Sequence, residues 1–129
     1  MATLTPTLTL VSTDAFSHQP INISVTDSLS VVAPYTDLSR VAAATDGSTL
    51  IIAQSGSPIT YIYIKHTGVL ASNGNATTNL VTVRDEDNAS IATLAAGEFC
   101  FFPLAAGIGL EVLTADAAAF VEYIYFSKA

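Results

Sequence analysis

NLVTVRDEDNASIATLAAGEFCFFPL, residues 79–104, contains three short strand patterns separated by two turn patterns. Val81 and Val83 alternate with polar residues, which is the two-residue period of a half-buried strand. The run Asp-Glu-Asp-Asn at 85–88 favours a tight reversal, because Asp and Asn hydrogen-bond their own backbone and tolerate left-handed dihedrals. Residues 91–94 and 98–104 supply two more strands around an Ala-Ala-Gly corner. Since 26 residues leave no room for a helix between them, we expect neighbouring strands to pair antiparallel.

The same alternation recurs along most of the chain and predicts an all-β fold. It is clearest in residues 59–66, ITYIYIKH. Residues 35–44 are open between a short helix capped by Asp37 and a strand or loop, and we favour the latter because a Thr-Asp-Gly-Ser turn follows at 45–48. Nine or ten short strands, with turns about every eight to twelve residues, predict an antiparallel β-sandwich with a jelly-roll-like topology. An immunoglobulin-like strand order stays open.

The N-terminal residues predict an arm in front of this domain. We expect residues 1–18 to form an extended arm or edge strand and residues 19–129 to form a single sandwich domain. Pro6 cannot donate to a β-ladder, so the strand at 3–11 lies at an edge or crosses to another subunit. Its apolar positions are the predicted capsid or subunit interface: Leu4, Pro6, Leu8 and Leu10. Residues 67–78 lack an apolar period and predict an exposed loop.

The charge content limits the possible partners. Only 12% of the residues are charged and the net charge is −7, against about 25% charged in ordinary soluble proteins. The four cations are Arg40, Lys65, Arg84 and Lys128. Four scattered cations argue against a nucleic-acid partner. No apolar run reaches the ~20 residues of a membrane-spanning helix. With a mean hydropathy of +0.51, the chain is expected to bury surface against copies of itself.

The candidate catalytic residues do not form a recognisable pattern. His18 and His66 stand 48 residues apart, with no His-x-His motif, and we interpret both as surface histidines. No Gly-x-Ser-x-Gly motif is present. Cys100 lies between phenylalanines, which predicts a buried, unreactive thiol. We therefore expect no enzyme activity and no cofactor.

Two clusters remain as candidate binding sites. Asp85, Asp87 and Asn88 offer hard oxygen ligands that suit Ca²⁺, although a solvated turn is the preferred interpretation. Four tyrosines of the strand patterns at 59–66 and 120–126 offer a surface for a glycan or a subunit, or are simply same-face neighbours on paired strands. They are Tyr61, Tyr63, Tyr123 and Tyr125.

The segment 81–104, with its acidic turn, Ile-Ala-Thr-Leu-Ala-Ala-Gly-Glu corner and aromatic strand ending in Pro-Leu, resembles small β-sandwich virion proteins of tailed bacteriophages. Gly-Leu-Glu-Val-Leu at 109–113 and Val-Glu-Tyr-Ile-Tyr at 121–125 are similar in the same way. The resemblance implies a capsid decoration (cement) protein, made in the host cytoplasm and bound to the major capsid protein on the outer head surface. It also implies a homo-oligomer, with a trimer favoured. The alternative is a tail, fibre or neck module that binds a host-surface glycan or another virion protein.

Overall fold

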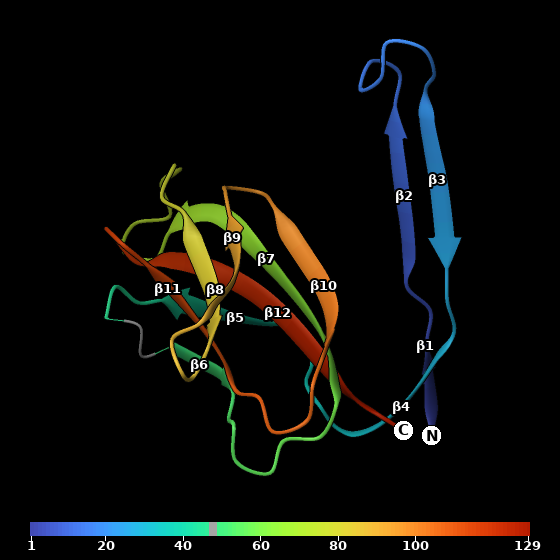
Figure 1. The fold of residues 1–129 in the computed structure, drawn as a ribbon. Helices are drawn as coiled ribbons and strands as arrows, with labels where there is room; N and C mark the ends of the chain where they lie inside the picture. Colours follow the sequence, from blue (N-terminus) through green and yellow to red (C-terminus); the bar gives the residue numbers. More distant parts are fainter. Residues whose placement is uncertain (47–48) are drawn as a thin grey trace. The chain divides into compact units, whose positions relative to one another are not determined.

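The computed structural model describes residues 1–46 and 49–129, which contain twelve strands and no helix (Figure 1). The strands are β1 (Ala2–Leu4), β2 (Thr7–Ser12), β3 (Ile21–Thr26), β4 (Leu29–Tyr35), β5 (Ser39–Ala43), β6 (Thr49–Ile52), β7 (Thr60–Leu70), β8 (Val81–Asp85), β9 (Ser90–Leu94), β10 (Phe99–Leu104), β11 (Leu110–Thr114) and β12 (Ala119–Lys128). Their recorded pairings are all antiparallel. The prediction of an all-β antiparallel fold is confirmed.

The chain divides into two compact units, and the division falls inside β4. Unit 1 comprises residues 1–32 and 128–129, and unit 2 comprises residues 33–127. Unit 1 contains the β2–β3 hairpin, drawn in Figure 1 as two long strands side by side, and the pairing of β1 with the first half of β4. The arm predicted at 1–18 would end in the turn between β2 and β3, whereas unit 1 continues through Val32 because β3 pairs with β2.

The strands β5 to β12 of unit 2 pair as a nested set. β5 pairs with β12, β6 with β11, β7 with β10 and β8 with β9. Pairing of β12 with β7 and of β11 with β8 joins these four hairpin-like pairs into two sheets. We call them the β12 sheet (β5, β12, β7, β10) and the β11 sheet (β6, β11, β8, β9). Every connection from β5 to β12 changes sheet except the one from β8 to β9.

One hydrophobic core is shared by the two sheets of unit 2. On β7, Ile62 and Ile64 are fully buried, and so are Val81 and Val83 on β8 and Val112 on β11. On β7 and on β8 the two buried residues are separated by one residue, as the alternation of a strand requires. Both sheets therefore place one side against the same core and leave a second, outer side.

The turn chemistry predicted for residues 79–104 is confirmed. The Asp85 carboxylate accepts hydrogen bonds from the amides of Asp87 (3.0 Å) and Ala89 (2.8 Å), and Asn88 takes the left-handed φ of 69°. In the next corner Gly97 has φ 85°. The turn residues thus satisfy their own backbone, as short polar side chains and glycine allow.

The pairing predicted after the second turn was wrong. β9 pairs with β8, but β10 pairs with β7 in the other sheet. The corner crosses the core because its backbone binds β7: the Gly97 amide donates to the His66 carbonyl, and the His66 amide donates to the Glu98 carbonyl, both at 2.9 Å. The exposed loop predicted at 67–78 is also shorter than expected, since β7 continues to Leu70, whose amide donates to the Asn75 carbonyl at 2.8 Å.

The break at Pro6 and the strand in the ambiguous segment 35–44 account for the higher strand count. The expected strand at 3–11 is split into β1 and β2 around Pro6, whose carbonyl accepts from the Asp27 amide at 3.1 Å. Pro34, expected to end a strand, lies inside β4. The ambiguous segment 35–44 contains the strand β5. The turn predicted at 45–48 falls partly outside the described residues.

Candidate interaction surface

The outer side of the β12 sheet carries a continuous row of aromatic residues. The β-ladder places Phe101 opposite Tyr63, and Tyr63 opposite Ile124. One step along, Tyr61 lies opposite Phe126. We define the outer aromatic face as Tyr61, Tyr63, Phe99, Phe101, Ile124 and Phe126. These residues alternate with the buried residues of the core, so their side chains point away from it.

Aromatic rings contact one another along this face, but only its edge is open to solvent, because Tyr61 is buried while Phe99 and Phe101 are exposed. Tyr63 and Phe99 lie with ring centroids 6.1 Å apart, and Tyr35 and Phe126 lie 6.3 Å apart. Phe99 on the edge strand β10 is nevertheless 59% exposed. Aromatic rings at such spacing form a rigid apolar surface. An uncharged edge strand with exposed phenylalanines is a site for pairing with another chain.

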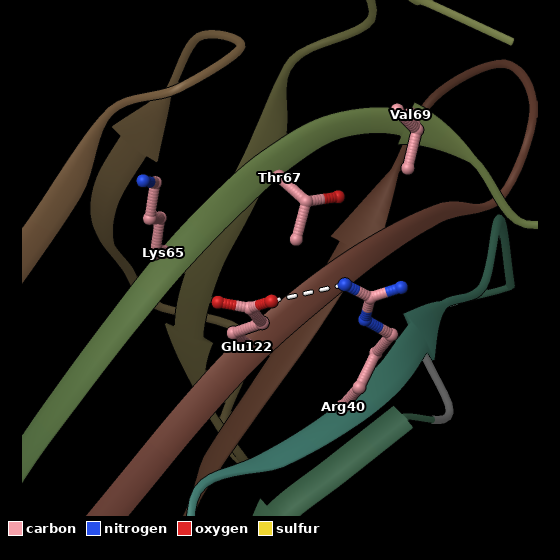
Figure 2. A pocket seen from close by; sticks show the side chains of 5 residues that line it. All are labelled: Arg40, Lys65, Thr67, Val69 and Glu122. Atoms are coloured by element: carbon pink, nitrogen blue, oxygen red, sulfur yellow. Dashed lines mark hydrogen bonds and ion pairs between the residues drawn. The ribbon is translucent and has the colours of Figure 1, made fainter. Parts of the chain in front are cut away.

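A charged hollow of about 380 Å³ adjoins the outer aromatic face (Figure 2). Arg40 of β5 donates to the Glu122 carboxylate of β12 at 3.0 Å, and its guanidinium lies 5.3 Å from the centroid of Phe120. Figure 2 shows Lys65 on the other side of Glu122. Thr67 and Val69 complete the lining. Two cations and one carboxylate give this part of an acidic protein a local positive charge.

Two titratable groups near the face, Tyr63 and Cys100, favour their neutral forms. Burial raises the pKa of Tyr63, and the nearby Glu122 carboxylate raises it further, with a smaller contribution from Cys100. Burial also raises the pKa of Cys100, which packs against the core from the inner side of β10. A thiol with a raised pKa is a poor nucleophile. Both groups therefore contribute packing surface at neutral pH.

The second uncovered surface is one side of the β2–β3 hairpin. The register places Leu8 opposite Val25 and Leu10 opposite Ile23. We define the hairpin apolar face as Leu8, Leu10, Ile21, Ile23 and Val25; the opposite side carries Thr, Ser and Asn with Val11. Four of the five face residues are 47–56% exposed. In residues 1–32, all of which are described, only Val31 is buried. An isolated two-stranded hairpin is at best marginally stable in water.

The predicted interface residues of the arm are only partly brought together. Leu8 and Leu10 belong to the hairpin apolar face. Leu4 lies in β1 and pairs with Leu29 of β4. Pro6 lies between the two strands. The break at Pro6 separates the four residues, which sequence alternation alone places on one strand.

The four predicted tyrosines do not form one surface. Tyr61 and Tyr63 belong to the outer aromatic face. Tyr123 lies opposite Ile64 and Tyr125 opposite Ile62, and both tyrosines pack against the core. The two pairs therefore occupy neighbouring strands, as expected, but opposite sides of the sheet.

The predicted cation ligands serve the turn between β8 and β9. The Asp85 carboxylate is engaged by two backbone amides, while Asp87 and Asn88 are exposed. Within residues 1–46 and 49–129, no group of three His, Cys, Asp or Glu side chains is placed to hold a metal ion. Nor do these residues include a helix of the length and apolarity that crossing a bilayer requires.

The interpretation of His66 as a surface residue was wrong. Its side chain is fully buried on β7, because it continues the inward series of Ile62 and Ile64. Nε2 lies 2.8 Å from the Asn79 carbonyl oxygen, and Nδ1 accepts from the Gly68 amide at 3.1 Å. Continuing the inward series of Ile62 and Ile64 to the next alternate residue would have found it. His18 is exposed, as predicted.

Comparison of the chain with protein-family models, with curated proteins and with solved structures gives no match. The candidate surface therefore rests on the geometry of this molecule.

Proposed function

We propose that this chain is a structural virion protein, a capsid decoration protein that self-associates and stabilises the outer surface of a phage head. The observation that carries the proposal is the amount of uncovered apolar surface. Most of the hairpin apolar face is open to solvent, and so are Phe99 and Phe101 at the edge of the outer aromatic face. Contiguous exposed apolar patches mark surfaces that other proteins cover. The role proposed is structural, without catalysis or a cofactor.

The strand order supports a finer description of unit 2 as a jelly-roll sandwich. Eight strands that pair as 5 with 12, 6 with 11, 7 with 10 and 8 with 9 match a long hairpin wound around a core, which is the arrangement of a jelly roll. Jelly rolls are common in viral capsid proteins and in lectins. This part of the argument is an analogy between folds.

The charge distribution supports the outside of a shell as the binding place. A chain of net charge −7 is repelled by packaged DNA. Two of its four cations, Arg40 and Arg84, are already paired with Glu122 and Glu111. A protein that binds assembled capsid protein and not free capsid protein shifts the equilibrium toward the particle by mass action. The proposed partners are therefore the major capsid protein and further copies of this chain.

Electron microscopy of labelled particles tests this proposal. Antibodies raised against the purified chain should label the outer surface of heads in virions of the phage that encodes it. Removing residues 1–12 should abolish binding of the purified protein to isolated heads, while unit 2 keeps its circular dichroism spectrum. Label on the tail alone, or on no part of the virion, would refute the head-decoration role.

The charged hollow favours one alternative, a tail, fibre or neck module that binds a host-surface glycan. Lys65 and Thr67 offer hydrogen-bond donors beside aromatic residues, which is the chemistry that holds a sugar ring. A glycan array probed with the purified chain tests it. Binding that disappears in both Lys65→Ala and Tyr63→Ala, but persists in Tyr123→Ala on the inner side, would favour this function over decoration.

A further inference from the structure

We propose that the hairpin apolar face of one copy packs on the outer aromatic face of a second copy, so that copies join head to tail in a closed ring. This inference deepens the self-association in the proposed function, on which it rests, and names the two surfaces that meet. It does not depend on the virion role.

The two surfaces match in length and in chemistry. β2 and β10 each contain six residues, which span about 20 Å at ~3.4 Å per residue. Neither strand contains a charged residue. The hairpin supplies branched aliphatic side chains, and the sheet supplies aromatic rings with Phe99 and Phe101 at its open edge. Aliphatic side chains packed on aromatic rings bury much apolar area without desolvating charge.

The charges around the two surfaces are complementary. Residues 1–32 contain Asp14 and Asp27 and no Lys or Arg. The outer aromatic face ends in the hollow that holds Arg40 and Lys65 with one carboxylate, Glu122. Two hairpins that met each other would bring acidic residues together. A hairpin on the sheet of a second copy instead meets the more positive part of an acidic chain, which favours that encounter.

The area of the contact favours a ring over a pair. A two-stranded ribbon of this length covers a footprint of about 20 Å by 10 Å, which is small beside the roughly 800 Å² that each partner buries in a stable interface. A pair of copies held by one such contact leaves one hairpin and one sheet unused. In a closed ring each copy gives one hairpin and receives another, so each copy makes two such contacts.

Sedimentation velocity of two charge-insertion variants and their mixture tests the proposal. Leu10→Asp places a carboxylate in the hairpin apolar face, and Phe101→Asp places one in the outer aromatic face. Each should weaken self-association ~100-fold or more, because the carboxylate would be buried without a partner. Val11→Asp, at a residue 66% exposed on the other side of the hairpin, and Ile91→Asp, at a residue 45% exposed on β9, are the matched controls and should assemble as the unaltered chain does.

The mixture is the decisive measurement. Leu10→Asp keeps an intact sheet face and Phe101→Asp keeps an intact hairpin, so an equimolar mixture should form a one-to-one dimer and nothing larger. Because one contact holds this dimer, it should form only at higher protein concentration than the assembly of the unaltered chain. A mixture that associates no more than either variant alone at the same high concentration would overturn the inference. So would a Phe101→Asp variant that still assembles, or an unaltered chain that is monomeric. Circular dichroism of each variant confirms that its strands remain folded. If the purified chain forms rings but antibodies do not label virion heads, the decoration function is refuted and the ring inference stands. If heads are labelled but the purified chain forms no ring, the ring inference is refuted and the decoration function stands.

Discussion

Replacing His66 by leucine removes the one imidazole that is enclosed by unit 2. The Gly68 amide can only donate, so Nδ1 must be the acceptor of that hydrogen bond and the ring proton lies on Nε2, which donates to the Asn79 carbonyl. His66→Leu leaves both backbone groups without a partner. His66→Gln restores a donor for the Asn79 oxygen but no acceptor for the Gly68 amide.

The expected loss can be estimated from these two hydrogen bonds. An unpaired buried polar group costs about 1–3 kcal/mol. Gly68 and Asn79 are half-buried, so the lower part of that range applies and two groups give about 2–3 kcal/mol. Leucine recovers a fraction of this through its larger apolar surface, which leaves about 2 kcal/mol for His66→Leu and about 1 kcal/mol for His66→Gln. At this chain length the larger loss lowers Tm by roughly 8 °C.

Urea unfolding followed by tyrosine fluorescence measures both losses, with equal m-values as the test that only stability has changed. His18→Leu is the matched control, because His18 is exposed and should change the free energy of unfolding by less than about 0.5 kcal/mol. The hydrogen-bonding role is refuted if His66→Leu unfolds at the same urea concentration as the unaltered chain, or if His18→Leu loses as much.

Three further predictions use the same measurements. Leu110→Ala should lower the free energy of unfolding by about 2–5 kcal/mol, because Leu110 is fully buried. Leu80→Ala, at a 52% exposed position, should change it by less than about 0.5 kcal/mol. Similar losses in the two variants would contradict the assigned core. Gly97→Ala should lower the free energy of unfolding by about 1–2 kcal/mol, measured by a thermal melt, because Gly97 has φ 85°. The cost comes from the backbone alone, since the added Cβ would meet no atom within 4 Å. An unchanged Tm would show that the turn relaxes. The free energy of unfolding should fall as pH rises above the pKa of an unfolded cysteine, about 8.5. Burial raises the pKa of Cys100, so the unfolded thiol releases its proton first. If the urea midpoint of Cys100→Ser falls equally with pH, other groups cause the pH dependence.

Most strand positions could be predicted because alternation and turn chemistry are local. Val81 and Val83 point inward by their spacing alone. Asp85 and Asn88 close the turn by hydrogen bonds within four residues. The pairing of the two tyrosine-bearing strands was also predictable, since β7 and β12 lie side by side in one sheet.

The choice of partner strand could not be predicted, because it depends on contacts far apart in the sequence. A corner such as 95–98 is compatible with a hairpin or with a crossing between sheets, and the crossing is decided by the hydrogen bonds of Gly97 and Glu98 with His66. The tyrosine surface failed for a related reason. Tyr63 and Tyr123 both alternate correctly within their own strands, but the register of β7 with β12 sets them on opposite sides.

The nested pairing has a consequence for how the chain acquires its shape during synthesis. β8 and β9 can close as soon as both have left the ribosome, whereas Ala43 of β5 pairs with Ala119 of β12, and β12 is made last. At about 5–20 residues per second, the earlier strand waits roughly 4–15 s for its partner. Each inner pair that has already formed shortens the loop that the next pair must close. Unit 2 is therefore expected to assemble from its middle outward, with β5 and β12 joining at the end.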